Sequence, residues 1–440
     1  MKKEIVILGG GWAGLTAAVE LSSHGHQVTL FEKRGHLGGR AYSFRDPASG
    51  SVLDNGQHLF MGCYSGTKRF LEKIGRLDDL HFQNNFRVDL AGPARNRPVR
   101  LQAWPLPAPW HLLGGLFGFQ GFSLQEKVSF LNLRKALQNE PLPTDIALPR
   151  WLEQMGQSKR VQERFWNLLA LAALNEEPRL CSAKLFQSML HEAFVSGRKG
   201  AVIGFSRVGL SDLYAEPAAE FIQKKGGHLF LKTAVTRLHF SGQELSEVEL
   251  EGGRRIAPEV VILAVPFSSL KKLLPESILY KDPFFQPIHK LQSSPIVSIN
   301  LWFDRDFIPN DFLGFWGTSI HWLFNKGQIL HDKGAPYYSV VMSGARNELL
   351  IPGPTLVQIA LRELSQIFPE AVKAKLLHSH VMKEPEATLS PAVGVNPMRL
   401  PQRTPYKNLF LAGDWTDTGL PATIEGAVRS AYRAVASVEG

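Results

Sequence analysis

Cysteine is nearly absent from this 440-residue chain, which contains only Cys63 and Cys181. Neither a CxxC pair nor a Cys/His cluster occurs, so a disulfide framework and the usual zinc sites are excluded. Long apolar runs are also lacking. Because no uninterrupted run of about 18 apolar residues exists, a transmembrane helix is not expected. We therefore expect a protein of a reducing compartment, with no metal.

The net charge is +9, yet the chain lacks a dense Lys/Arg stripe with interleaved aromatic residues and any nucleic-acid motif. Nucleic-acid binding is therefore not expected. Two interpretations of the positive charge stay open: scattered surface charge, or a patch that faces an anionic membrane. The two N-terminal lysines precede an apolar stretch too short for a signal peptide, and a buried first strand is favoured.

The length favours two domains, and the composition, with 44% hydrophobic and 20% charged residues, is that of a folded protein. The first apolar run, residues 5–8, predicts a buried strand. The pattern Gly9-x-Gly11-x-x-Gly14 follows it directly. Residues 15–23 then predict a helix that ends at His24-Gly25, and residues 27–31 predict a second strand.

Each part of this N-terminal segment has a task in binding a dinucleotide. Gly9 permits the tight turn, Gly11 lets the backbone approach a pyrophosphate, and Gly14 lets helix and strand pack closely. The helix N-terminus offers free N–H groups to the phosphates. Glu32, 18 residues after Gly14, is placed to bind a ribose diol. Trp12, Ala13 and Lys33 lie within the same segment. The motif alone does not distinguish NAD from FAD.

The following segments make that distinction. Residues 37–40 (Leu-Gly-Gly-Arg) and 54–58 (Asp-Asn-Gly-Gln-His) come after the acid, and residues 408–414 and 421–427 close the chain. Together they resemble the flavoprotein superfamily of monoamine oxidase and phytoene desaturase. The resemblance implies an α/β fold with two domains: a Rossmann-like FAD-binding domain and an inserted substrate domain of mixed sheet and helices, amine oxidase-like.

The same resemblance implies the contacts with FAD. Arg40 and its glycines approach the pyrophosphate and flavin, Asp414 contacts the ribityl and pyrophosphate region, and the backbone of Val235 contacts the adenine. The helix that begins near residue 424 points at the pyrimidine edge, where its dipole stabilises reduced flavin. The further cofactor-binding residues are Gly38, Gly39, Asn55, Gly56, Gln57, His58, Ala264, Gly413, Pro421, Ala422, Thr423 and Ile424.

We expect the FAD to be non-covalent, because neither cysteine lies near the closing motif in sequence. No other GxGxxG occurs, which argues against a separate NAD(P)H domain. We assign residues 1–78, 201–270 and 395–440 to the FAD-binding domain, and residues 79–200 and 271–394 to the substrate domain. Within the latter we predict helices over 123–200, strands at 295–307, 319–326 and 337–345, and an amphipathic helix over 355–368.

Residues 103–122 are rich in Trp, Phe, Leu, Pro and Gly and carry no charge apart from a protonated His111. The prolines and glycines exclude a spanning helix. Two interpretations remain. Either the segment borders an apolar pocket and docks on a membrane surface, or it is an ordinary buried part of the substrate domain.

A narrower resemblance covers nearly the whole chain. Residues 54–64, 165–175 with 181–183, and 412–427 closely resemble bacterial hydroxysqualene dehydroxylases, and the segment 54–58 is the most specific mark. That family implies reductive loss of the allylic hydroxyl of hydroxysqualene, a C30 isoprenoid, with hydride from reduced FAD and squalene as product. His58 is the candidate acid that protonates the departing hydroxyl, the alternative being a structural histidine that hydrogen-bonds the cofactor loop. Tyr64 and Asn175 are candidates for touching the hydroxyl, whereas Asp54 is expected to shape the turn.

Two other functions stay open. The same fold serves oxidative enzymes, namely polyprenoid desaturases of the carotenoid type and amine oxidases, and the sequence does not fix the direction of electron flow. A non-catalytic prenyl-lipid carrier is the third alternative, although the chain keeps Glu32, Arg40 and Asp414. Because a C30 substrate resides in membranes, we expect a cytoplasmic protein attached peripherally to the inner membrane face.

Overall fold

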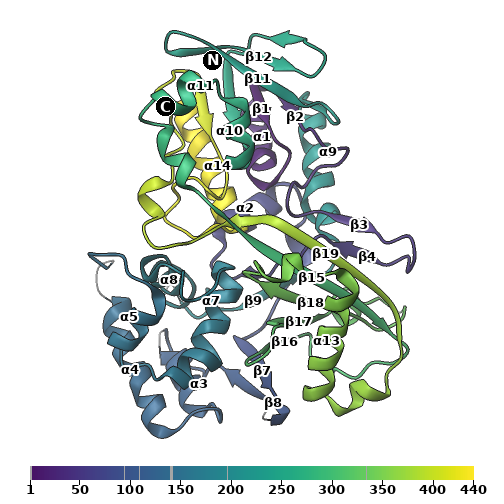
Figure 1. Cartoon of the computed structure of the whole chain (residues 1–440). Coiled ribbons are helices and arrows are strands. Elements are labelled where there is room, and N and C mark those ends of the chain that lie inside the picture. Colours follow the sequence, from purple (N-terminus) through teal and green to yellow (C-terminus); the bar gives the residue numbers. More distant parts are fainter. Residues whose placement is uncertain (1, 94, 109, 139–141, 196, 333) are drawn as a thin grey trace.

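The computed structural model describes residues 2–93, 95–108, 110–138, 142–195, 197–332 and 334–440. Figure 1 shows two regions, one containing both chain ends and the other built from the middle of the sequence. The first region contains the strands that the N-terminal and C-terminal motifs follow. The second contains a large sheet flanked by helices. The site lies where the two regions meet.

A five-stranded parallel sheet forms the first region. Its order is β10 (His228–Phe230), β2 (Gln27–Phe31), β1 (Glu4–Leu8), β14 (Val260–Leu263) and β20 (Leu409–Leu411). Ile5 and Ile7 pack on one face of the sheet, while Val6 and Leu8 pack on the other. Because both faces are covered, the strand is apolar at consecutive positions, as the sequence predicts.

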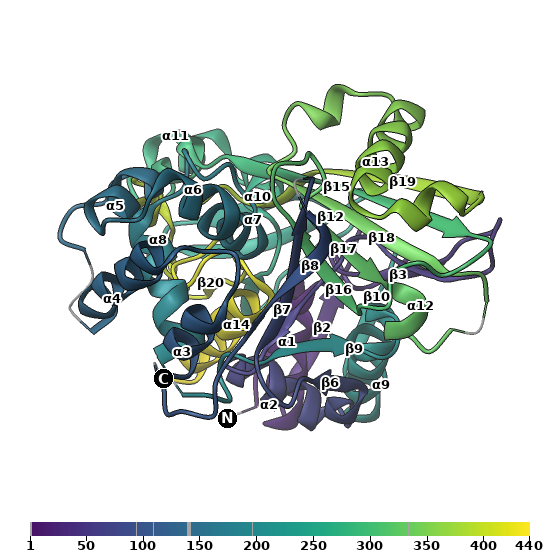
Figure 2. The ribbon, with the colours of Figure 1, turned by 90° about the horizontal axis from the view of Figure 1, so that it is seen from below.

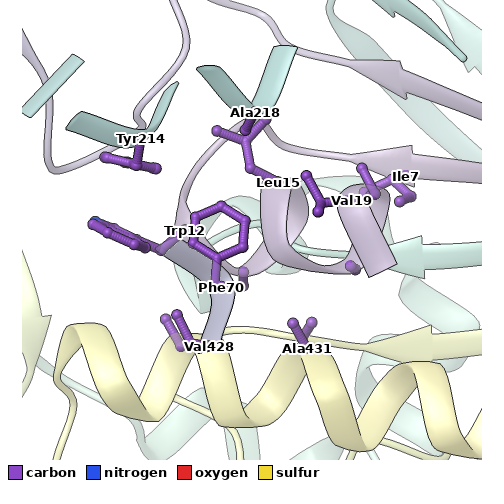
Figure 3. Packing of buried hydrophobic residues seen from close by; sticks show 14 of the residues in the cluster. Ile7, Trp12, Leu15, Val19, Phe70, Tyr214, Ala218, Val428 and Ala431 are labelled. Atoms are coloured by element: carbon purple, nitrogen blue, oxygen red, sulfur yellow. The ribbon is translucent and has the colours of Figure 1, made fainter. Parts of the chain in front are cut away.

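Helices α1 (Trp12–Ser23), α9 (Glu216–Lys224) and α14 (Ile424–Glu439) cover the first face. Helix α1 is buried on nearly all sides because it lies between the other two helices and the sheet. Its first residue, Trp12, stacks on Tyr214 and meets Phe70 edge-on (Figure 3). The start of α1 is therefore fixed by packing immediately beside the glycine turn.

The other face carries a small antiparallel sheet and two short helices. The sheet contains β11 (Val235–Ser241), β12 (Glu244–Leu250) and β13 (Arg255–Ile256), and the helices are α10 (Phe267–Leu273) and α11 (Glu276–Lys281). Strand β10 ends at Phe230 and the hairpin begins at Val235, so the chain turns at the edge of the parallel sheet.

The second region is built on a seven-stranded sheet, in the order β19 (Leu376–Leu389), β15 (Ser293–Phe303), β18 (Tyr337–Ser343), β17 (Trp322–Asn325), β16 (Phe312–Phe315), β7 (Arg87–Gly92) and β8 (Arg95–Gln102). Helix α13 (Gly353–Ile367) packs on one face. On the other side lie α3 (Trp110–Gly118), α4 (Leu124–Gln138), α5 (Leu148–Gln154), α7 (Asn167–Leu174) and α8 (Ala183–Leu190) (Figure 2).

The predicted strands at 295–307, 319–326 and 337–345 correspond to β15, β17 and β18, and the predicted helix over 355–368 corresponds to α13. The helical character of 123–200 is confirmed, with π-helical turns at Gln162–Trp166 and His191–Val195. The domain limits remain a prediction. Strand β9 (Ile203–Ser206), assigned above to the FAD-binding domain, packs its Ile203 and Phe205 into the apolar cluster of the second region.

Candidate functional site

Two adjoining cavities occupy the junction of the regions. The first has a volume of about 400 Å³ and lies between the glycine turn, the closing motif and strand β19. The second has a volume of about 280 Å³ and lies between the large sheet and helices α7 and α8. Arg40, His58 and Thr423 are among the residues that line both. The cavities are therefore two parts of one site.

The glycine turn of the first cavity requires its glycines. Gly9 has φ +104°, and a Cβ there would lie 2.5 Å from the Ala264 carbonyl oxygen. A Cβ on Gly14 would lie 1.8 Å from the Gly9 oxygen, so this residue packs behind the turn and does not line the cavity. Gly11 is the N-cap of α1 and lines the cavity. The N-terminus of α1 thus faces the space that the motif predicts for a pyrophosphate.

Glu32 lies at the end of β2, inside the same cavity. Its Oε2 accepts a hydrogen bond from the Gly10 N–H at 2.8 Å, and its Oε1 accepts one from the Arg34 N–H at 2.8 Å. The residue is buried. Each carboxylate oxygen has a further lone pair for a ribose hydroxyl. Glu32 therefore braces the turn as well as offering the predicted acceptor.

Arg40 joins the two ends of the chain. Its Nη2 lies 2.6 Å from Asp414 Oδ1, and its Nη1 donates to the Ala387 carbonyl of β19 at 3.0 Å. Asn55 steadies this arrangement, because its Nδ2 donates to the Arg40 carbonyl at 2.8 Å and its Oδ1 accepts from the Tyr42 N–H. The Leu-Gly-Gly-Arg segment, the 54–58 segment and the closing motif are thus brought together as predicted.

A buried arginine that the sequence reasoning missed holds the closing loop. Arg399 donates to the carbonyl oxygens of Asp414 at 2.8 Å and Thr416 at 2.6 Å, and it also contacts those of Trp415 and Leu420. Burial lowers the pKa of Arg399 to about 10, which still leaves it charged at neutral pH. The side chain therefore neutralises several carbonyl dipoles and fixes the loop that carries Asp414.

The start of α14 completes the wall between the cavities. Thr423 is its N-cap, and the Thr423 hydroxyl accepts from the Gly426 N–H at 3.1 Å. Glu425 is buried and accepts from the backbone N–H groups of Gly66 and Thr67, each at 2.9 Å. These contacts tie α14 to α2 (Ser65–Lys73), so the helix N-terminus is held toward the site.

The second cavity has mainly apolar walls. Side chains of the large sheet form one side, and those of α7, α8 and the following π-helical turn form the other. The apolar lining residues include Phe86, Val88, Leu169, Leu171, Met189, Phe194, Ile296, Phe312, Trp322, Phe324 and Val341. Such a cavity favours a ligand with few polar groups.

Comparison with known proteins agrees with this geometry. The model of the family described as flavin containing amine oxidoreductase matches residues 12–438. The chain belongs to this family. A hydroxysqualene dehydroxylase of Sinorhizobium fredii is 30% identical over 440 residues, which is 99% of this chain and 98% of that protein. A 15-cis-phytoene desaturase of an Oncidium hybrid cultivar is 28% identical, covering 97% of this chain and 76% of its own length.

Solved structures of the family share the fold. An oxidoreductase from Methanosarcina mazei superposes with a TM-score of 0.78 at 17% identity, over 100% of both chains. A putrescine oxidase variant superposes with a TM-score of 0.75 at 15% identity, over 100% of this chain and 99% of the other. The two-domain architecture expected from the sequence is thus confirmed.

As in the family, the cofactor is FAD and the protein is a flavin-dependent oxidoreductase. The residues present fit the cofactor. The glycine turn leaves room only for backbone, and the buried Nε2 atoms of Gln57 and His58 have no hydrogen-bond partner among the described residues. The first cavity is also lined by predicted cofactor-binding residues, namely Trp12, Ala13, Lys33, Gly38, Gly39, Val235, Ala264, Gly413, Ala422 and Ile424. The second cavity is lined by Gly56, Gln57 and Pro421.

The FAD is non-covalent, and both cysteines carry free thiols. Although Cys63 lies far from the closing motif in sequence, it lines the second cavity together with Ile424 of that motif. Burial raises the pKa of the Cys63 thiol to about 12, so the reactive thiolate is not formed at neutral pH. Within the described parts of the chain, no cluster of His, Cys, Asp and Glu side chains is arranged to hold a metal ion.

His58 lies at the boundary of the two cavities. Burial lowers the pKa of its imidazole to about 4, although the nearby Asp54 opposes this change. The ring is therefore neutral at pH 7 and does not act as a charged acid. Asp54 does more than shape a turn. Its Oδ2 forms a buried ion pair with Lys326 at 2.8 Å, and its Oδ1 accepts from the Leu210 N–H.

Tyr64 and Asn175 both line the second cavity. Burial raises the pKa of the Tyr64 phenol, which stays protonated. The side chain of Asn175 is already used by the protein: its Nδ2 donates to Thr388 Oγ1 at 3.0 Å and its Oδ1 accepts from the Gly344 N–H at 3.0 Å. Asn175 also adopts a left-handed conformation, with φ 51°. These contacts give it a structural role, and its contact with a substrate stays a prediction.

Strand β19 is the part of the site that sequence reasoning missed. It contributes Glu384, Ala387 and Thr388 to both cavities and Glu386 to the first. The apolar residues of 376–389 occur in adjacent pairs and do not alternate with polar ones, so the pattern does not predict a strand. Pro385 was the signal available, because a proline within a strand marks a bulge or an edge.

Proposed function

We propose that this chain catalyses the reductive dehydroxylation of hydroxysqualene to squalene. The observation that carries the proposal is an end-to-end match with proteins of that activity. The hydroxysqualene dehydroxylases of Sinorhizobium fredii and Zymomonas mobilis are each covered over at least 97% of their length, at 30% and 25% identity. The phytoene desaturases, at similar identity, are covered over 76–78%.

The second cavity supports an isoprenoid substrate. Its walls are mainly aliphatic and aromatic, which favours a hydrocarbon ligand over water in the space next to the flavin cradle. His58 and Tyr64 supply uncharged polar groups near that boundary, and each is a candidate to orient the single hydroxyl of the substrate. The apolar walls would hold the allylic carbon close to the cofactor.

The chemistry needs a donor of hydride and a dry site. When bound in its reduced form, FAD supplies the hydride that replaces the hydroxyl. The protein binds the hydrocarbon chains, keeps water out, and holds a proton for the departing oxygen. The N-terminus of α14, fixed through Glu425 and Thr423, contributes a positive dipole at the cavity boundary.

An anaerobic product assay tests the reaction. Enzyme loaded with FAD and reduced without oxygen is mixed with hydroxysqualene, and the products are identified by mass. We expect squalene in amounts that match the flavin reoxidised. Formation of no squalene, together with aerobic dehydrogenation of phytoene, would overturn the proposal in favour of a desaturase.

We also propose that the chain docks on the inner face of the cytoplasmic membrane through α3 and α4. Residues 103–122 fit both interpretations of this segment, because one part of it is buried and another part is exposed. Ala103, His111, Leu116, Phe119 and Phe122 are buried, whereas a second set is exposed. That exposed set, the α3–α4 apolar face, consists of Trp104, Leu106 and Trp110 with Leu124, Val128 and Leu131 of α4.

The character of this face favours a lipid surface. The three α4 residues are spaced at i, i+4 and i+7, so they share one side of the helix. Two exposed tryptophans suit the interface between headgroups and acyl chains. Arg160 donates to the Gly121 carbonyl between α3 and α4 and pairs with Glu126 at 3.6 Å, so the proposed contact with lipid rests on the apolar residues. No helix among the described residues has the length and apolar character needed to cross a bilayer.

Vesicle sedimentation tests the docking. With vesicles of phosphatidylglycerol and phosphatidylethanolamine, we expect the wild type to sediment and the triple variant W110S/L124S/V128S to stay in solution. The control is Leu350→Ser, a change at an exposed leucine remote from this face in sequence. Equal sedimentation of the wild type and the triple variant, or a monomer–dimer change without lipid binding, would contradict it.

A further inference from the structure

The boundary between the two cavities carries a single acidic side chain. Of the residues that line both cavities, three are ionisable: Arg40, His58 and Glu384. Arg40 is paired with Asp414. His58 is buried and neutral. Glu384 is therefore the only one of the three that carries a carboxyl group.

The Glu384 carboxyl group is not used by the protein. Among the described residues, no hydrogen bond or ion pair engages it. The other carboxyl groups of the second cavity are committed. Glu425 accepts from Gly66, Thr67 and Arg429, and Glu192 pairs with Arg429. Of the acids lining this cavity, only Glu384 is free to act on a ligand.

A distortion of strand β19 places Glu384 at the boundary. Ser294 of β15 pairs with Thr388, but Ile296 pairs with Glu384, so β19 advances four residues while β15 advances two. The extra residues, Pro385 to Ala387, form a bulge. Its Ala387 carbonyl accepts from Arg40. Bulges are common next to active sites, where they redirect side chains.

We propose that Glu384 is the proton donor to the departing hydroxyl group, an inference that rests on the proposed function. The carboxyl proton passes to the hydroxyl oxygen as the allylic C–O bond breaks, and water leaves. The allylic carbon then accepts a hydride, which the reduced flavin provides as it is oxidised. The resulting Glu384 carboxylate takes a proton from water after the product departs.

Single-turnover kinetics of Glu384→Gln test the assignment. Reduced, FAD-loaded protein is mixed anaerobically with hydroxysqualene, and flavin reoxidation and squalene are both followed. We expect the rate to fall about 100-fold or more, the usual contribution of a general acid. Glu370→Gln is the control, because Glu370 is exposed and lines neither cavity.

A second substrate separates proton donation from structural damage. In the allylic chloride that corresponds to hydroxysqualene, the leaving group departs without a proton. We expect Glu384→Gln to react with this chloride as fast as the wild type does. Its FAD affinity, measured by flavin fluorescence, and the change that bound substrate causes in the oxidised flavin spectrum are expected to match those of the wild type.

The outcomes are distinguishable. If the wild type forms squalene and Glu384→Gln does so equally fast, the inference is overturned and the proposed function stands. If the variant binds FAD and substrate but is slowed equally on alcohol and chloride, Glu384 is not the proton donor. If the wild type forms no squalene from either substrate, the proposed function and the inference are both overturned.

Discussion

Arg40 donates to Asp414 across 2.6 Å, although the two residues are 374 positions apart in sequence. Arg40 is partly exposed and Asp414 is buried. The pair therefore links the N-terminal FAD-binding segment to the C-terminal one where the two cavities meet. We therefore expect the affinity for FAD to depend on this contact.

The variant Asp414→Asn is expected to weaken FAD binding by at least about tenfold, because Arg40 loses its charged partner and the cradle loosens. Flavin fluorescence titration of the apoprotein measures the change. Asp417→Asn, an exposed position on the same loop, is the control and is expected to bind as the wild type does. Equal affinities in all three proteins would refute this role of the pair.

The buried pair of Asp54 and Lys326 joins the FAD-binding region to the large sheet's region. Lys326→Met leaves the Asp54 carboxylate without its partner, and we expect the free energy of unfolding to fall by about 3–5 kcal/mol. Urea unfolding followed by circular dichroism provides the measurement. Lys373→Met breaks an exposed pair with Glu370 and is expected to change stability by less than about 0.5 kcal/mol. Similar losses in both variants would speak against a special role for the buried pair.

Gly14→Ala is expected to abolish FAD binding, because the new Cβ would lie 1.8 Å from the Gly9 oxygen and would push the turn out of shape. The flavin absorbance per purified chain measures the loss, and circular dichroism checks that the chain is folded. Gly353→Ala is the control, since its nearest contact would be at 3.7 Å. A folded Gly14→Ala protein that holds one FAD would disprove this explanation.

His321 predicts a pH dependence of stability. Burial lowers the pKa of its imidazole from 6.5 to about 4, and its Nδ1 accepts from the Ser343 N–H at 2.9 Å. Because the folded pKa is the lower one, the unfolded chain binds more protons between these values. The stabilisation is thus complete above pH 6.5 and is lost as the pH falls toward about 4.

For the wild type we expect His321 to account for a loss of about 2 kcal/mol between pH 7 and pH 4. His321→Gln keeps an acceptor for Ser343 but does not titrate, so its unfolding free energy is expected to fall less over that range. His81→Gln, at an exposed position, is expected to follow the wild type. Parallel pH profiles for the wild type and His321→Gln would count against the prediction.

The sequence predicted the cofactor cradle well because its determinants are local. The spacing of Gly9, Gly11 and Gly14 between strand and helix has one physical use, and the segments near Arg40 and Asp414 are short and specific. Strands β1, β14 and β20 were equally predictable, since burial on both faces makes nearly all their residues apolar, whereas β10 at the sheet edge is partly exposed.

The remaining parts of the site depend on partners that lie far away in sequence. The sequence suggests that Lys326 is a surface lysine, but the fold places it against Asp54, 272 residues away in sequence. Arg399 reads as an ordinary charge, although it binds the carbonyls of the closing loop. Strand β19 was not predicted because its apolar residues do not alternate with polar ones and it contains Pro385, which lies in a bulge. Asn175 is the opposite case: the sequence suggested that it touches the substrate, but its polar side chain forms hydrogen bonds within the fold.

The order of strands in the parallel sheet has a consequence for synthesis. Strand β1 pairs with β14, which ends at residue 263, and β14 pairs with β20, which begins at residue 409. The cradle is therefore incomplete on the ribosome until residues 409–411 have emerged. Before that point the nascent protein holds unpaired apolar strand edges, which are prone to aggregate and suit chaperone binding. We therefore expect FAD to bind after these strands have paired and to stabilise the folded chain by mass action.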